Sequence, residues 1–441
     1  MDLMGDIGAA DQLISARMEN KLLKVKVEEL KNKVTELTLS NATLLAEVEM
    51  YRKDAALPSF STMALGKASA AEVEQKPLHD FLSSGNGVYP TDAAVSLSNL
   101  HGITNPLCCA LDRSDSVMAT GGADSYLALT AWGAALAPTA NASVDTVNKA
   151  ARIPLSAPVI CVSFSNTDNI VAAGCMDGTV HLIGYKLALG RVVATLISGN
   201  DIKFTKYVKS LAWSPSKNML ASASADGTVV LTNVKLGNSE DDDEMMDGGE
   251  NYSTILEPVK SFHLSGAVET LCFVNDGNVL CLYERETSVL TYFDLNDDFA
   301  ATSHSLNGSV TGGFDSHVSF AVMQLVLSPN GMYLCAATDA SRNIIIEVGT
   351  SNIVRDLYGH KNDGFSQPRV AWSNSGEYIF GNSQEDSGLC VWDIASTKLL
   401  QTGAHKGQHT GKIRDIFGSK MSDTIVTASY DKNVKVWLNE F

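Results

Sequence analysis

The sequence lacks any apolar run near the roughly 18 residues that a membrane-spanning helix needs. Its first residues, MDLMGDIGAADQ, also lack the basic start and the apolar stretch of a secretory signal peptide. We therefore expect no membrane span and a cytoplasmic location, with the nucleus as an alternative.

Cysteines never occur in the C-x-x-C spacing that is typical of zinc and redox sites. The eight cysteines lie mostly inside apolar, strand-like runs, at positions 108, 109, 161, 175, 272, 281, 335 and 390. This distribution predicts reduced thiols in the core and argues against a disulfide framework or a zinc site.

Basic residues are outnumbered, with 33 Lys and Arg against 50 Asp and Glu, and the formal net charge is −17. Proteins that bind duplex nucleic acid derive affinity from cations that replace counterions on phosphates, so we expect no direct nucleic-acid contact. Hydrophobic residues make up 45% of the chain and charged ones 19%, a balance that predicts an extensive core rather than wholesale disorder.

The common catalytic signatures are missing too. The sequence contains no G-x-x-x-x-G-K-[ST] phosphate loop, no G-x-S-x-G nucleophile turn and no H-E-x-x-H zinc motif. His405 and His409 have a spacing that could bind a metal on a helix, but Gly407 favours a loop. We therefore predict a protein that is not an enzyme and has no catalytic residues, cofactor or metal.

Residues 11–57 contain no Gly or Pro, and apolar residues recur there at alternating spacings of four and three. The resulting heptad seam consists of Leu23, Val27, Leu30, Val34, Leu37, Asn41, Leu44 and Val48. Valine at position a with leucine at position d favours a parallel two-stranded coiled coil, and an Asn at position a fixes its register. The segment therefore predicts a dimerisation helix, which Pro58 ends.

Two alternatives to a homodimeric coil stay open. Lys26 would face Lys31 across a homodimer, and a different partner chain would relieve that repulsion. The helix could instead pack on its own protein, although five heptads exceed the usual globular length. Residues 58–92 are rich in Ser, Ala, Gly and Pro and are predicted to form a linker.

From residue 93 to the end of the chain, one pattern of short apolar strands and polar turns returns seven times. Six copies carry an acid at the second turn, at Asp124, Asp177, Asp226, Asp339, Asp386 and Asp431. The fourth copy offers Glu284 or Glu286 instead. The successive spacings of 45 to 53 residues (386 to 431 and 124 to 177) are those of propeller blades, which bury their apolar faces against one another.

The last copy ends after its third strand, whereas a blade needs four. The alternating segment Ala94–Leu100 precedes the first copy and can supply the missing strand. We therefore predict that it pairs beside Val434–Leu438 and closes the ring, because closure removes exposed strand edges.

Several motifs resemble those of the WD-repeat family of seven-bladed β-propellers. They are Gly359-His360 with Trp392-Asp393, SPSKNMLASASADGT at 214–228 and TASYDKNVKVW at 427–437. The resemblance implies an all-β fold over residues 93–441, a seven-bladed β-propeller, here preceded by the long coiled-coil α-helix.

The resemblance also implies a buried His, Ser or Thr, Asp and Trp that hydrogen-bond within a blade. The matching residues are His360, Ser383, Asp386 and Trp392 in the sixth copy and His409, Ser429, Asp431 and Trp437 in the last. The other copies depart from this pattern, with Thr130, Ile183 and Thr232 in the place of Trp. Only His263 and His317 are approximate matches there for the His.

An acidic insertion, residues 238–253, separates the third copy from the fourth, and residues 240–250 include seven acids. A solvated loop is the simpler interpretation. A tethered arm that binds a basic partner is the alternative, and Ser239 ahead of four acids resembles a kinase site whose phosphorylation would deepen the charge.

Together these features predict a non-enzymatic scaffold that gathers protein partners on a propeller and is paired by its coiled coil. A protein component of an RNA-processing or ribosome-assembly particle is the alternative. The resemblance would also allow a role in a ubiquitin ligase, but the residue two positions after Asp393 is not the Arg expected of propellers that bind a cullin adaptor.

Overall fold

The computed structural model describes residues 24, 26, 31, 33, 88–132, 150–188, 191–237, 253–285, 287, 289–306, 320–362, 367–385, 387–401 and 408–438. Contacts divide the chain into two units, residues 1–75 and 76–441. The four residues described in the first unit are exposed lysines in helical conformation. All residues of the predicted heptad seam, and Ser239, lie outside the described residues, so the coiled coil and the phosphorylation site stay predictions.

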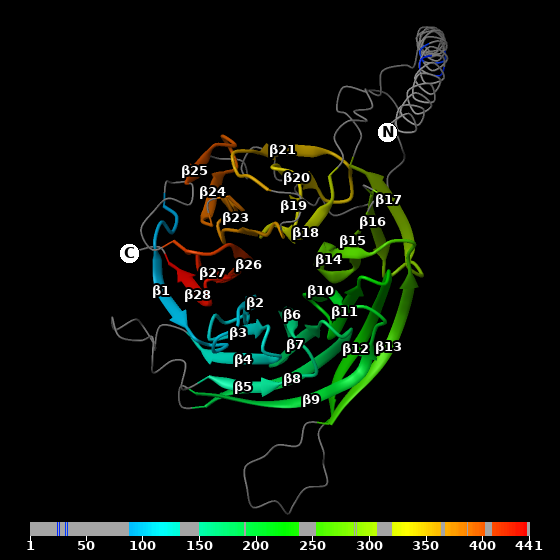
Figure 1. Ribbon diagram of the computed structural model, residues 1–441. Helices are drawn as coiled ribbons and strands as arrows, with labels where there is room; N and C mark the ends of the chain where they lie inside the picture. The colour runs from blue at the N-terminus through cyan, green and yellow to red at the C-terminus, as the bar shows by residue number, and fades with distance from the viewer. Residues whose placement is uncertain are drawn as a thin grey trace, which may run out of the picture. The chain divides into compact units, whose positions relative to one another are not determined.

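The second unit contains a ring of seven four-stranded antiparallel sheets, or blades, built from 28 strands in the described residues (Figure 1). The all-β seven-bladed propeller is thereby confirmed. In each blade the first strand lies nearest the centre of the ring. Among the described residues, no helix is long and apolar enough to cross a membrane.

The first four blades follow one another along the chain. Blade 1 contains β2 (Pro106–Leu111), β3 (Val117–Gly122), β4 (Tyr126–Ala131) and β5 (Ala151–Pro154). Blade 2 contains β6 (Val159–Phe164), β7 (Ile170–Cys175), β8 (Thr179–Ala188) and β9 (Arg191–Lys203). Blade 3 contains β10 (Val208–Trp213), β11 (Met219–Ser224), β12 (Thr228–Gly237) and β13 (Ser253–His263). Blade 4 contains β14 (Val268–Val274), a 3-10 turn (Asn275–Gly277), β15 (Val279–Glu284), β16 (Val289–Asp294) and β17 (Ala300–Ser305).

The remaining three blades complete the ring. Blade 5 contains β18 (Val322–Leu327), β19 (Tyr333–Thr338), β20 (Asn343–Glu347) and β21 (Ile353–Leu357). Blade 6 contains β22 (Val370–Trp372), β23 (Tyr378–Asn382), β24 (Leu389–Asp393) and β25 (Leu399–Gln401). Blade 7 contains β26 (Ile413–Gly418), β27 (Ile425–Ser429) and β28 (Asn433–Trp437), and its outer strand is β1 (Ala93–Ser98).

The core is divided among the seven blade interfaces. Seven apolar clusters are present in the described residues, and each joins two neighbouring blades. Successive residues of one strand enter different clusters: Leu220 packs toward blade 2, whereas Ala221 packs toward blade 4. This follows from the two-residue period of a strand, which presents alternate side chains to opposite faces of the sheet. Both faces of each blade are therefore buried by its neighbours.

The predicted ring closure is confirmed, with a shift of the boundaries by one or two residues. β1 pairs with β28 in antiparallel register, Leu97 lying opposite Val434. Leu97 is 1% exposed and lies in the cluster between blades 7 and 1. The contact begins earlier than predicted, because Tyr89 packs on Tyr378 with ring centroids 5.2 Å apart. Residues at the end of the predicted linker thus also secure the ring.

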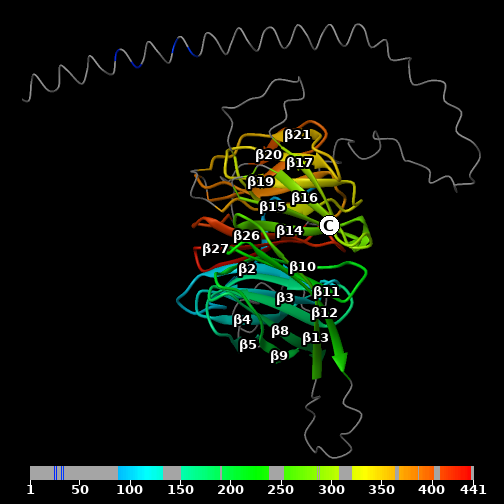
Figure 2. The same ribbon diagram turned by 90° about the vertical axis from the view of Figure 1, so that its right-hand side faces the viewer.

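The strands end on two faces of the ring, which differ in the loops they carry. We call the face with the turns between second and third strands the turn-acid face, because the recurring acids lie there. The opposite face carries the connections between third and fourth strands, including the ends of β12 and β13 where the acidic insertion begins and ends, and we call it the insertion face. Figure 2 shows β12 and β13 reaching past the neighbouring strands.

Glycine is required at two of the turn-acid turns. Gly178 and Gly227 have φ angles of 85° and 86°, in the left-handed region that favours glycine. A Cβ on Gly178 would lie 2.5 Å from the carbonyl oxygen of Phe204, and one on Gly227 would lie 2.7 Å from that of Leu264. These turns therefore let the following blade connection approach closely.

Side chains at one repeated position of the inner strands link every blade to the next. We call these the tie residues; they are Cys108, Cys161, Ser210, Thr270, Gln324, Arg369 and Asp415. In blades 3, 4 and 5 the tie residue accepts a hydrogen bond from a backbone N–H of the following inner strand, at 3.3, 3.0 and 2.8 Å. Cys108 and Cys161 instead donate to the carbonyl oxygens of Val159 and Val208, both at 3.7 Å.

The last two ties are ionic and complete the circle. Arg369 Nε of blade 6 lies 3.3 Å from Asp415 Oδ1 of blade 7. The second oxygen of Asp415 accepts a hydrogen bond from the Cys109 N–H of blade 1 at 2.9 Å. The seven ties thus form one closed circuit around the inner strands, in addition to the apolar interfaces.

Candidate functional site

The recurring acids bind the chain segment that enters their blade. Asp226 accepts hydrogen bonds from the Thr205 N–H at 2.8 Å and from its hydroxyl at 2.9 Å. Asp339 accepts one from the Ala321 N–H at 2.7 Å. The same role is played by Glu284 in blade 4, which accepts a hydrogen bond from Ser265 Oγ at 2.6 Å.

In two of these acids, Asp226 and Asp431, the hydrogen bonds lower the pKa of the carboxyl group. Burial would raise the pKa of Asp226, but hydrogen bonds from Thr228 and Thr205 outweigh it and lower the pKa to about 2. Burial would likewise raise the pKa of Asp431, yet its hydrogen bonds with His409 and two backbone N–H groups bring it well below the usual range. Asp226 and Asp431 are therefore charged, and their charge helps to fix the segments that enter blades 3 and 7.

In blade 7 the predicted buried network is present with one change of member. His409 Nδ1 lies 2.8 Å from Asp431 Oδ2, and its Nε2 lies 2.7 Å from Thr427 Oγ1. The indole N–H of Trp437 donates to the same Thr427 oxygen at 2.9 Å. The bridging hydroxyl is therefore that of Thr427.

Ser429, which the sequence analysis assigned to this bridge, makes different bonds. Its hydroxyl donates to the carbonyl oxygens of Gly411 and Lys412, at 2.9 and 3.1 Å. Ser429 and Thr427 point to the same face of β27 because they are two residues apart, so a Ser or Thr is available at both positions. Only Thr427 lies between the imidazole and the indole.

Blade 1 contains the same network, which the sequence analysis missed. His101 Nδ1 lies 2.9 Å from Asp124, and its Nε2 lies 3.0 Å from Thr120 Oγ1. Thr130 stands in place of the tryptophan, as the sequence suggested, and its buried hydroxyl has no partner among the described residues. The missed signal was spacing: His101 precedes Asp124 by 23 residues, and His409 precedes Asp431 by 22.

The sequence prediction named His263 and His317 as approximate matches for the histidine outside the two clearest copies, and it overlooked His101. His263 is exposed and its Nδ1 lies 3.3 Å from the Thr228 hydroxyl, which belongs to its own sheet in blade 3. This assignment was therefore wrong for His263, while His317 lies outside the described residues.

In blade 6 the predicted network is not assembled among the described residues. The ring nitrogens of His360 are buried without a partner in the described part of the chain, and the Trp392 indole donates to the Tyr358 carbonyl oxygen at 2.7 Å. The hydroxyl bridge is absent because Gly381 occupies the place of Thr427; a Cβ there would lie 2.8 Å from the Trp392 ring.

The imidazole of His360 packs edge-on against Trp392, with ring centroids 5.1 Å apart. The Ser383 hydroxyl accepts a long hydrogen bond, 3.5 Å, from the Lys361 N–H, and among the described residues it makes no hydrogen bond with the histidine ring. Asp386 lies outside the described residues.

His360 should make the ring sensitive to acid. Burial lowers its pKa from 6.5 to about 4, so that between these values the unfolded chain binds a proton that the folded chain does not. Stability contributed by the neutral ring is therefore present above pH 6.5 and is lost as the pH falls toward 4. We expect His360→Phe to remove about 3 kcal/mol of the stability loss between pH 7 and pH 4, measured by urea unfolding. Equal pH dependence in both proteins would contradict this assignment.

Around these fixed loops, the turn-acid face exposes large side chains. The five with the greatest exposure are Ile103, Met176, Tyr207, Tyr358 and Tyr430. They come from turns and connections of blades 1, 2, 3, 6 and 7, and Ile103 is 87% exposed. The three exposed tyrosines of the described residues, Tyr207, Tyr358 and Tyr430, all lie on this face. Tyrosine is enriched in protein interfaces because it combines a broad apolar surface with a polar tip.

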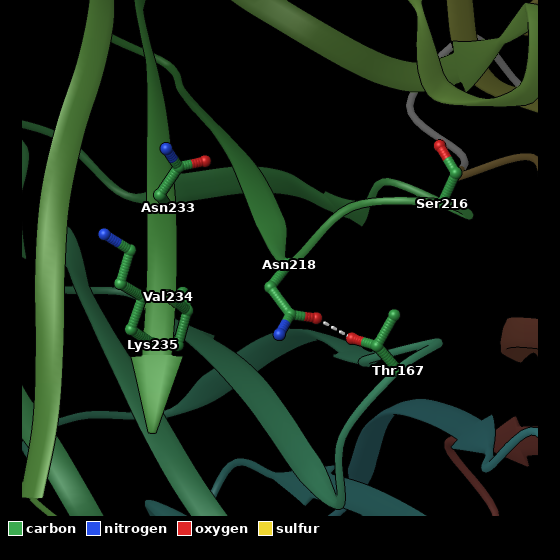
Figure 3. Close-up of a pocket in the computed structure, with 6 residues that line it drawn as sticks. All are labelled: Thr167, Ser216, Asn218, Asn233, Val234 and Lys235. Carbon is green, nitrogen blue, oxygen red and sulfur yellow. Dashed lines mark hydrogen bonds between the residues drawn. The ribbon is translucent and has the colours of Figure 1, made fainter. Parts of the chain in front are cut away.

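A shallow, open pocket of about 450 Å³ lies on the insertion face between blades 2 and 3. Figure 3 shows its lining residues: Thr167, Ser216, Asn218, Asn233, Val234 and Lys235. Thr167 donates a hydrogen bond to Asn218 across the two blades. The lining has amide, hydroxyl and ammonium groups and no carboxylate, imidazole or thiol.

No group of three or more His, Cys, Asp or Glu side chains in the described part of the chain could hold a metal. The thiols of all eight cysteines are free, and six of them are buried in the strands. Burial raises the pKa of Cys108, Cys109 and Cys335, which keeps these thiols protonated.

Comparison with known families identifies three segments of the chain. The model of the WD domain, G-beta repeat, matches residues 153–183, 191–233 and 398–437. The sixth copy, which was among the clearest by sequence, is not among these segments, whereas the second is. A comparison with the curated proteins gave no match. The chain thus carries WD40 repeats in a seven-bladed arrangement, which in general indicates a scaffold for protein–protein interaction.

The matched repeats are out of phase with the blades. The segment 191–233 covers β9, the outer strand of blade 2, and then the three inner strands of blade 3. The same offset leaves the last repeat without an outer strand, and β1 supplies it. The phase of the repeat therefore explains why the ring is closed by residues from before its first blade.

Proposed function

We propose that this protein is a non-catalytic scaffold that binds protein partners on the turn-acid face of its propeller. The observation that carries the proposal is the combination of exposed Tyr and Met side chains with loops that hydrogen bonds to the recurring acids hold in place. Rigid loops lose little conformational freedom on binding, so their contact area contributes more fully to affinity.

Pairing of two copies through residues 11–57 is a second part of the proposal, supported by the heptad seam. Two tethered rings bind a multivalent partner more tightly than one ring, because the second contact is intramolecular. The acidic insertion is joined to the other face of the ring, at β12 and β13, so an acidic arm and the tyrosines could serve separate partners.

We expect Tyr207→Ala combined with Tyr430→Ala to weaken partner binding at least about 10-fold, the effect of losing two interface tyrosines. The measurement is quantitative affinity purification of the full chain, followed by titration of each recovered partner with purified proteins. Met332→Ala with Met421→Ala, on the insertion face, is the matched control because both methionines are also exposed. Partners whose affinity falls only in the methionine variant would show that binding takes place on the insertion face and not on the turn-acid face.

The alternative, a protein component of an RNA-processing or ribosome-assembly particle, predicts a different result in the same purification. Partners would be lost on nuclease treatment, and the tyrosine variants would retain them. Removal of residues 1–87 tests the pairing, because light scattering should give the full chain twice the 47.0 kDa of one copy and the truncated chain the mass of a single copy.

A further inference from the structure

Six inner strands begin on the turn-acid face with a β-bulge, which adds one residue to the strand. We call the added residues the bulge residues; they are Leu107, Ile160, Lys209, Glu269, Met323 and Arg414. They lie immediately before the tie residues and surround the inner rim of the ring, which the first strands form (Figure 1).

Two of the three charged bulge residues neutralise each other. Lys209 Nζ lies 2.7 Å from Glu269 Oε2, across the junction of blades 3 and 4. The other oxygen, Glu269 Oε1, lies 3.1 Å from Arg285 Nη1, and the Glu269 side chain is 1% exposed. This buried carboxylate is therefore satisfied by two cations of this chain.

Arg414 differs, because one of its terminal nitrogens has no acceptor in the described part of the chain. Its Nη1 is buried and makes no hydrogen bond among the described residues. The neighbouring acid, Asp415, has one oxygen on Arg369 and the other on the Cys109 N–H. A buried donor without a partner carries a desolvation cost that other interactions of the fold must offset.

The surroundings of Arg414 favour an incoming anion. Burial lowers the pKa of Arg369, and the like charge of Arg414 lowers it further, although Asp415 and Glu269 oppose both effects. The bulge residue of the adjoining blade 1, Leu107, is apolar and brings no charge that could screen Arg414. A guanidinium group in such partly desolvated surroundings binds carboxylates strongly and in a fixed orientation.

We propose that Arg414 binds a carboxylate group of a protein partner at the inner rim of the turn-acid face. The inference rests on the proposed function and names the chemistry of its partner: an exposed segment with one Asp, Glu or C-terminal carboxylate. A single acid fits better than an acidic run, because the net charge of −17 repels highly acidic chains.

The test begins with random peptides displayed on phage and selected on the immobilised full chain. Synthetic copies of the selected peptides are titrated against the native protein by fluorescence anisotropy. We expect an Asp, Glu or free C-terminus in common, and a loss of affinity of at least about 10-fold in Arg414→Met. Arg414→Lys should lose less, because it keeps the charge but not the paired donors. Lys206→Met, which removes an exposed cation from the same face, is the control and should change affinity less than about 3-fold.

A charge-neutral version of each selected peptide tests whether its acid contacts Arg414 directly. Replacing its acid with the matching amide should weaken binding to the native chain but not to Arg414→Met, as expected for two groups in direct contact. Peptides whose affinity depends on Tyr207 and Tyr430 but not on Arg414 would overturn this inference and leave the proposed function standing. If no selected peptide loses affinity in Arg414→Met or in the Tyr207 and Tyr430 variants, this inference and the proposed function are both wrong.

Thermal unfolding of Arg414→Met separates binding from structure. Removing a donor that has no partner should leave the midpoint unchanged or raise it. A fall of more than about 5 °C would show that Arg414 supports the fold, and would overturn its assignment to a partner.

Discussion

Removing residues 1–100 should prevent the ring from closing and should cost about 5 kcal/mol or more, a large part of the stability of an ordinary domain. The deletion removes β1, whose Leu97 is 1% exposed, and with it Leu100, which is 2% exposed. It also exposes the edge of β28, which presents unpaired N–H and C=O groups to other chains. We expect little soluble protein, and a strongly lowered unfolding midpoint for any that is recovered.

Two comparisons make this result specific to the closing strand. A chain that starts at residue 88 keeps Tyr89 and all of β1, and its midpoint should stay within a few degrees of the full chain. A synthetic peptide of residues 88–102, added to the shorter chain, should restore part of the lost stability. Normal folding without residues 1–100 would show that β28 tolerates an open edge and that closure by β1 is dispensable.

Asp415→Ala should lower the free energy of unfolding by about 3 kcal/mol, because it removes one partner of a largely buried ion pair. Burial raises the pKa of Asp415, which Arg369 and the Cys109 N–H oppose. The substitution leaves Arg369 without its 3.3 Å partner and the Cys109 N–H without its acceptor. Two of the seven ties are broken at once, and urea unfolding at pH 7 would measure the loss.

The matched substitutions separate the charge from the hydrogen bond. Asp415→Asn keeps an acceptor for Cys109 and should cost less than Asp415→Ala. Arg369→Met combined with Asp415→Ala should cost less than the sum of the two single changes, because the second removes a charge already left unpaired. Additive losses would show that the two groups stabilise the ring independently. The contact between Arg369 and Asp415 would then contribute nothing to the stability of the interface between blades 6 and 7.

The propeller was predictable because its constraints repeat along the chain. A blade must alternate apolar side chains, since both of its faces are buried, and it must turn sharply, which brings an acid to each second turn. The missing outer strand of the last blade followed from a count of strands, and the pairing of Leu97 with Val434 agrees with it.

The buried networks were predicted only in part. His409, Asp431 and Trp437 come together as expected, but through Thr427, because two hydroxyl groups on one face of β27 cannot be distinguished by pattern alone. In blade 6, His360 and Trp392 are both present, yet Gly381 removes the bridge between them. His101 was missed because blade 1 lacks the tryptophan that draws attention to the motif, although its spacing to Asp124 carried the signal.

The sequence by itself therefore determined the number of blades, the turns and the strand that closes the ring, because each of these is written as a local, repeated pattern. Only the tertiary structure decided which side chains join one blade to the next. The tie residues include a cysteine, a serine, a glutamine, an arginine and an aspartate, which share no motif. Any side chain that can donate or accept a hydrogen bond across the gap satisfies that position, so the constraint lies in the distance between neighbouring strands and not in the identity of the residue. The unpaired nitrogen of Arg414 likewise appears only when the partners of every nearby acid are known.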